Sequence, residues 1–90
     1  MPEGRKRATA LRYREGSDAP EVVATGAGEI ANKILDAAEA AGVPVRRDPA
    51  LVEALSKLDV GRMIPPELYT AVAEALVWAY RLDAKASRRP

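Results

Sequence analysis

Two glycines between an expected strand and an expected helix have the clearest potential for chemistry. Gly26 and Gly28 belong to a run reading Gly-Ala-Gly-Glu-Ile-Ala, which matches the G-x-G-x-x-A pattern of dinucleotide-binding folds. In those folds the glycines let the backbone approach a pyrophosphate at a helix N-terminus. Asp48 follows about 20 residues later, where such folds place a ribose-binding carboxylate. The pattern therefore raises the hypothesis of a small nucleotide-binding protein.

A structural interpretation of the same run is simpler, and we favour it. Glu29 would place a negative charge beside any bound phosphate, and 90 residues cannot build both halves of a dinucleotide fold. Glycines also serve tight turns from a strand to a helix, and Asp48 followed by Pro49 is a typical helix start. On this interpretation Asp48 caps a helix and binds no ribose.

The usual residues of catalysis and metal binding are missing. The chain contains no cysteine and no histidine, which excludes disulfides, thiolate ligands and the commonest general base near neutral pH. Its serines stand outside any nucleophile motif, and its carboxylates are spread as on solvated helix faces. We therefore expect no enzyme, no metal site and no cofactor.

Length and composition indicate one small domain. With 48% apolar and 30% charged residues, the 90-residue chain fits a soluble globular protein. The longest apolar run, residues 75–80, has six residues, whereas a bilayer span needs about 20. The N-terminal bases are not followed by the apolar run of a signal peptide. We expect a cytoplasmic protein.

The net charge of +1 is distributed unevenly. Residues 1–14 carry +4 and residues 85–90 carry +3, whereas residues 15–84 hold six bases against twelve acids and carry −6. Basic ends on an acidic body are seen in proteins that bind nucleic acids or membrane surfaces. Nucleic-acid binding through the basic termini is therefore the alternative function, although solvated termini that keep a small domain soluble are the simpler interpretation.

The hydrophobic pattern predicts alternating strands and helices. Alternation and β-branched residues predict strands at residues 8–13, 21–25 and 43–47, the last at a sheet edge because Pro44 donates no ladder hydrogen bond. Apolar spacing and caps predict helices from Gly28 to a cap at Gly42, from Asp48 through Leu58, and from Pro65 to Leu82.

These elements define an expected fold class. A strand, a helix and a second strand form a right-handed crossover with parallel strands. We expect an α/β protein, a small mixed sheet of three to four strands covered by about three helices in a single domain. The expected division is a basic N-terminal segment at residues 1–7, the folded domain at 8–82 and a flexible basic tail at 83–90.

The last predicted helix carries apolar residues beyond its inner stripe. Its apolar face is widened by Ala71, Ala73, Val77 and Trp78, and Ala19-Pro20 in the loop before the second strand could form a rigid lip beside it. A helix that is apolar over most of its circumference is either buried on two sides or presents a patch to a partner. Both interpretations stay open on the residues alone, with burial the simpler.

Four segments together carry a family resemblance. They read ATALRY at residues 8–13, APEVVATGAG at 19–28, VPV at 43–45 and IPPELYTAVAEALVW at 64–78. In order and spacing they resemble the cytoplasmic C-terminal domain of FlhB, the switch protein of the flagellar type III export gate, and of its relatives YscU, SpaS and EscU in virulence secretion systems. The resemblance covers roughly residues 8–82.

The chain departs from this family at the self-cleavage motif. The family cuts itself at Asn-Pro-Thr-His just upstream of the first strand, and the matching positions here are Glu3, Gly4, Arg5 and Lys6. The single asparagine, Asn32, precedes lysine and not proline. We expect self-cleavage to be absent, and the chain to be a stand-alone version of the cleaved C-terminal fragment, without the family's membrane domain and one N-terminal strand.

The resemblance implies a function and a site. The family's domain binds export substrates, rod and hook subunits before filament subunits, and an apolar patch that receives early substrates matches Ala19, Pro20, Ala73 and Leu76. We expect a non-catalytic protein-binding module of the flagellar or type III export apparatus that contacts export substrates or gate components. It would be cytoplasmic, recruited to the inner-membrane export gate, and a monomer or weak oligomer.

Overall fold

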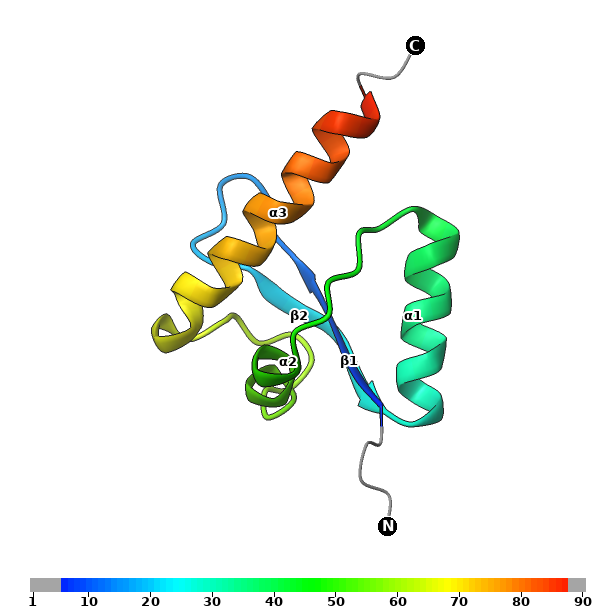
Figure 1. Ribbon diagram of the computed structural model, residues 1–90. Coiled ribbons are helices and arrows are strands. Elements are labelled where there is room, and N and C mark those ends of the chain that lie inside the picture. Colours follow the sequence, from blue (N-terminus) through cyan, green and yellow to red (C-terminus); the bar gives the residue numbers. More distant parts are fainter. Residues whose placement is uncertain (1–5, 88–90) are drawn as a thin grey trace.

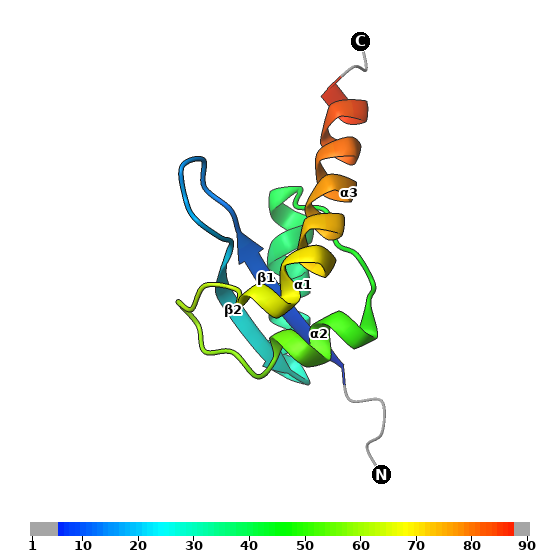
Figure 2. The same cartoon turned by 90° about the vertical axis from the view of Figure 1, so that its left-hand side faces the viewer.

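Two strands lie between layers of helices. The computed structural model describes residues 6–87, and side chains are described through residue 82. The elements are β1 (Arg7–Arg12), β2 (Glu21–Ala27), α1 (Glu29–Ala41), α2 (Pro49–Leu55), the 3₁₀ turn η1 (Pro66–Leu68) and α3 (Tyr69–Ser87). Helix α1 covers one face of the sheet, and α2 and α3 lie on the other (Figures 1 and 2). The α/β class and the three helices agree with the sequence-based prediction.

The sheet is smaller than predicted and is not mixed. Within residues 6–87 it has two strands, which pair antiparallel from Arg7 opposite Ala27 to Arg12 opposite Glu21, with one irregularity between Ala10 and Leu11. The first two predicted strands are confirmed, and β2 continues two residues past Thr25 because Gly26 pairs with Ala8.

The third predicted strand, residues 43–47, is not formed, and the parallel crossover built on it was wrong. The Val43 N–H donates to the Ala38 carbonyl at 2.9 Å and completes the C-terminal cap of α1 at Gly42, which has the predicted left-handed conformation. Pro44 has no N–H to donate. The side chains of Val43 and Val45 are 53% and 52% exposed, so no buried face holds this segment in register with a strand.

Small residues allow α1 to pack closely on the sheet. The cross-strand pairs Ala8–Gly26 and Ala10–Ala24 lie on the same face, because side chains alternate along a strand. A Cβ added to Gly26 would lie 2.8 Å from the Cβ of Ile30 in α1, which shows that this face meets the helix. Ala31 of α1 is fully buried.

The main hydrophobic core lies on the opposite face of the sheet. Its buried side chains come from β2, α2, α3 and the connection before η1, and partly buried leucines surround them: Val22, Leu55, Ile64 and Val72, with Leu11, Leu51, Leu58, Leu68 and Leu76. Three backbone hydrogen bonds tie the connection to β2 and to the residue before it. They run from the Gly61 N–H to the Val22 carbonyl (2.7 Å), from the Val22 N–H to the Arg62 carbonyl (2.9 Å) and from the Ile64 N–H to the Pro20 carbonyl (2.9 Å). These bonds fix Ile64 in the core and carry the chain to the start of α3.

Asp48 caps α2 as predicted, and its substitution has a defined expected cost. Its Oδ1 accepts a hydrogen bond from the Leu51 N–H at 3.2 Å, and Pro49 occupies the first helical position. Asp48→Ala should lower the free energy of unfolding by about 1 kcal/mol, measured by urea denaturation. Asp48→Asn keeps an acceptor at this position and should cost less; an equal loss in both variants would contradict the capping role.

Helix α3 extends past the core. Helix α3 runs to Ser87, five residues beyond the predicted end at Leu82, and its C-terminal half projects from the body (Figure 1). Residues 1–5 and 88–90, which include parts of the predicted basic end segments, lie outside the described residues. Among the helices of residues 6–87, none is long and apolar enough to cross a membrane.

Candidate functional site

The two glycines of the G-x-G-x-x-A run serve the fold in different ways. Gly28 is the N-cap of α1 with φ 62°, and its N–H donates to the Lys6 carbonyl at 2.8 Å, so this donor is not directed at a ligand. Gly26 lies inside β2 and allows Ile30 to approach. The carboxylate of Asp48 is engaged as a helix cap. These contacts favour the structural interpretation over phosphate binding.

A groove lies where the loop before β2 meets α3. It has a volume of about 310 Å³, and its lining includes all four residues to which the family resemblance pointed, Ala19, Pro20, Ala73 and Leu76. We call it the apolar groove. The loop and the helix are far apart in sequence, but the hydrogen bond from the Ile64 N–H to the Pro20 carbonyl brings them together, because Ile64 lies shortly before η1, which leads into α3.

The four residues differ in what they offer to a ligand. Ala19 is 5% exposed, and Leu76 packs against the hydrophobic core, so both contribute mainly to the wall of the groove. Pro20 is half-buried, and Ala73 is exposed on α3. A ligand would therefore meet Ala73 and Pro20 most directly.

Three tyrosines at the apolar groove were missed by sequence reasoning. Tyr13, Tyr69 and Tyr80 line it and are 43%, 45% and 58% exposed. Tyr69 and Tyr80 flank the apolar stripe of the last helix, and this spacing was the signal that could have pointed to them. Tyrosine combines a large apolar surface with a hydroxyl, a combination enriched at protein interfaces.

The chemistry of the apolar groove suits binding more than reaction. Besides the tyrosine hydroxyls, its polar lining is Asp18, and the remaining side chains are Ala19, Pro20, Val72, Ala73, Leu76 and Val77. Within the described residues, no group of three or more acidic side chains could hold a metal ion. The groove can bury apolar side chains of a peptide while the tyrosine hydroxyls bond its backbone.

Known structures share this fold. The chain is similar to the C-terminal domain of PscU, with a TM-score of 0.76 and 33% identity over 81% of this chain and 95% of that one. It is also similar to a variant of the EscU/SpaS C-terminal domain, with a TM-score of 0.81 and 29% identity over 84% and 96% of the two chains. The architecture is thus that of the C-terminal domains of these secretion proteins.

The sequence matches give the family. The model of the FlhB HrpN YscU SpaS family matches residues 5–79, and the chain belongs to this family. It is 46% identical to an uncharacterized protein, YlqH of Bacillus subtilis, over 87% of this chain and 85% of YlqH. It is 47% identical to the flagellar biosynthetic protein FlhB of Aquifex aeolicus over 79% of this chain.

The relatives differ in length. The chain spans about a fifth of the FlhB relatives, 21% of the Aquifex protein and 20% of the Salmonella typhimurium protein, so it corresponds to one part of them. Family membership supports a role in flagellar and type III protein export. None of these similarities points to nucleic-acid binding.

Proposed function

We propose that the chain is a protein-binding module of the flagellar or type III export apparatus, which contacts export substrates or gate components through the apolar groove. One observation carries the proposal: Ala19, Pro20, Ala73 and Leu76, which come from two distant segments, line a single groove. Membership of a family of export proteins supplies the context. The partner is an apolar peptide segment that covers Ala73 and Pro20.

The proposed role includes no self-cleavage. Asparagine cyclisation needs an asparagine at the scissile bond, and residues 3–6 read Glu-Gly-Arg-Lys. Asn32 stands in α1, where its N–H donates to the Gly28 carbonyl at 3.1 Å. We infer that the module works as a binding protein on the cytoplasmic side of the export gate.

Ala73→Asp tests the proposed function. A carboxylate at this exposed position stays hydrated in the free protein. An apolar peptide in the groove would desolvate the carboxylate without pairing it, which is unfavourable for binding. The affinity for rod- or hook-type export substrates should fall about tenfold or more, measured by isothermal titration calorimetry.

Ala73→Ser is the matched control. It keeps a small side chain without a charge and should bind within about threefold of the unchanged protein. Equal binding by Ala73→Asp would contradict the groove as the binding site. Unfolding of Ala73→Asp would show that residue 73 belongs to the core, and the site would then be wrong.

A further inference from the structure

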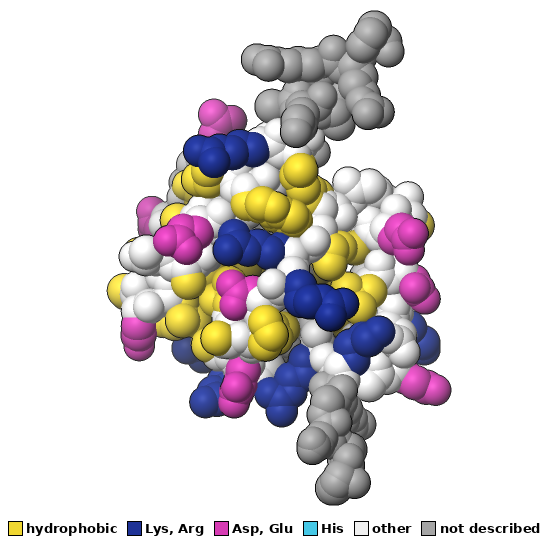
Figure 3. Space-filling model, in the orientation of Figure 1, with side chains coloured by type: hydrophobic (Ala, Val, Ile, Leu, Met, Phe, Trp, Pro, Cys, Tyr) yellow, Lys and Arg dark blue, Asp and Glu magenta, His cyan; other side chains and the backbone are white. Residues whose placement is uncertain are grey.

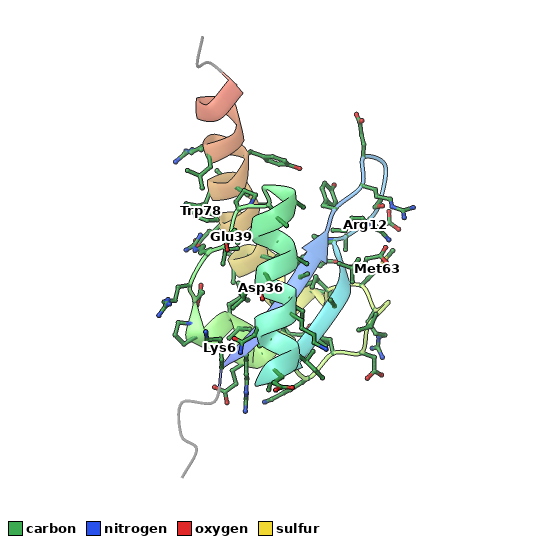
Figure 4. The ribbon with its side chains drawn as sticks, turned by 90° about the vertical axis from the view of Figure 1, so that its right-hand side faces the viewer. Lys6, Arg12, Asp36, Glu39, Met63 and Trp78 are labelled. Carbon is green, nitrogen blue, oxygen red and sulfur yellow. The ribbon has the colours of Figure 1, made fainter. Side chains whose placement is uncertain are left out.

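A second groove lies against α3, on the side of the segment that joins α1 to α2. It has a volume of about 590 Å³ and is lined by Arg46, Thr70, Glu74, Trp78 and Arg81, together with Ala73 and Val77. We call it the arginine groove. Figure 4 shows Trp78 on α3 close to the connecting segment.

The two grooves adjoin along α3. Ala73 and Val77, one helical turn apart, line both of them. Figure 3 shows hydrophobic side chains along α3 with Lys and Arg side chains among them. A peptide that covers Ala73 in the apolar groove can therefore extend into the arginine groove without leaving the surface of α3.

Two guanidinium groups in this groove are available to a ligand. The guanidinium carbon of Arg46 lies 6.0 Å from the centroid of the Trp78 ring, a distance at which a cation is attracted to the ring face. Arg81 follows Trp78 by three residues, so both side chains lie on one side of α3. Among the side chains of residues 6–82, one ion pair is formed, between Arg12 and Glu21 at 3.5 Å. The guanidinium groups of Arg46 and Arg81 are therefore not paired with a described carboxylate.

We propose that the arginine groove binds carboxylate side chains of the peptide whose apolar residues occupy the apolar groove. Guanidinium groups bind carboxylates with paired hydrogen bonds, and the indole of Trp78 offers an apolar surface beside them. The inference rests on the proposed function for the apolar half of the ligand. It adds that the same peptide carries an acidic residue near the apolar residue that covers Ala73, which we call the anchor.

Helix geometry gives the expected spacing between the anchor and the acidic residue of the peptide. Ala73 and Arg81 are eight residues apart, which is about 12 Å along a helix axis. An extended peptide covers about 3.3 Å per residue. The acidic residue is therefore expected about three to four positions from the anchor that covers Ala73.

A peptide fits these charges better than a nucleic acid. Glu74 lines the same groove, and residues 15–84 carry a net charge of −6, which repels a polyanion. Single-strand binding also uses several aromatic platforms within a basic channel. The arginine groove has one aromatic residue, and the adjoining apolar groove, with its three tyrosines, has no Lys or Arg in its lining. One or two carboxylates match two guanidiniums.

The single tryptophan of the chain, Trp78, reports on the groove directly. The probes are two synthetic peptides built on the export-substrate segment that binds in the Ala73 experiment, with glutamate in one and glutamine in the other at positions three and four from the anchor. Titrations followed by Trp78 fluorescence at low salt should show that the glutamate peptide binds about 2- to 30-fold more tightly, the range for two exposed ion pairs. Added salt should reduce this ratio.

Three variants separate the arginine groove from the apolar groove. Arg46→Ala combined with Arg81→Ala should abolish the preference for the glutamate peptide and leave the affinity for the glutamine peptide unchanged. Glu74→Gln should increase the preference, because it removes the one carboxylate from the lining. Arg47 is exposed, follows Arg46 in the chain and lines neither groove. Arg47→Ala should therefore leave the affinities for both peptides unchanged.

The outcomes distinguish the two proposals. Equal affinities for both peptides, lost together in Ala73→Asp, would overturn the arginine groove and keep the proposed function. If no substrate segment binds, the proposed function fails. An acidic peptide is then titrated alone, and if it leaves Trp78 fluorescence unchanged, the arginine groove is overturned as well. Tighter binding of a single-stranded oligonucleotide than of the glutamate peptide would also overturn it.

Discussion

Ile64→Ala is expected to lower the free energy of unfolding by about 2–5 kcal/mol, measured by urea denaturation followed by circular dichroism. The Ile64 side chain is 2% exposed and packs with Val22, Leu55 and Val72. Its N–H is held by the Pro20 carbonyl at 2.9 Å, so the backbone cannot move in to fill the cavity. The total free energy of unfolding of a 90-residue domain is about 5–13 kcal/mol, so this loss is a large share of the total.

Met63→Ala is the matched control for this prediction. Met63 is 51% exposed and forms an isolated bridge with Glu21, so it shares the backbone environment of Ile64 without its burial. Its truncation should cost about 0.5 kcal/mol or less. Similar losses in the two variants would show that stability depends on the segment and not on the buried side chain.

The elements that could be predicted are those specified by local sequence. The cap at Gly42, the N-cap at Asp48 and the apolar spacing of the last helix each act within one or two turns of chain, and the structure has all three. The segment at 43–47 alternates like a strand, but a strand also needs a neighbour to pair with. Within residues 6–87 no backbone hydrogen bond joins this segment to β1 or β2, and no local pattern could reveal that.

The candidate site was predictable only in part for a related reason. The resemblance pointed to Ala19, Pro20, Ala73 and Leu76, and the structure brings them together in one groove. The arginine groove depends on the path of the connection between α1 and α2, which places Arg46 beside Trp78 across 32 positions of sequence. That approach is set by tertiary packing and leaves no periodic signal in either segment.

Gly26→Val is expected to lower the free energy of unfolding by about 3 kcal/mol, the upper part of the range for overpacking. Gly26 has no left-handed backbone conformation, so the cost does not come from its dihedral angles. It comes from space, because a Cβ at this position would lie 2.8 Å from the Cβ of Ile30 and still closer to its Cγ2. Urea denaturation of the purified variant measures the loss.

Two further variants identify the source of this cost. Gly16→Ala places a methyl group where nothing lies within 4 Å, so it should cost only the strain of its left-handed backbone, about 1–2 kcal/mol. Ile30 is 57% exposed, so Ile30→Ala alone should cost about 1 kcal/mol or less. Added to Gly26→Val, Ile30→Ala should restore part of the stability, because the Cγ2 contact is gone while the Cβ contact remains.

The same double variant decides what the first glycine of the G-x-G-x-x-A run does. If Gly26 serves the close packing of β2 and α1, the effects of Gly26→Val and Ile30→Ala are non-additive, and the combination is more stable than their sum predicts. If the glycine were there for a phosphate, Gly26→Val would leave the free protein's stability unchanged and the two substitutions would act independently. The pattern in the sequence is identical in the two cases, and only the contact with Ile30 distinguishes them.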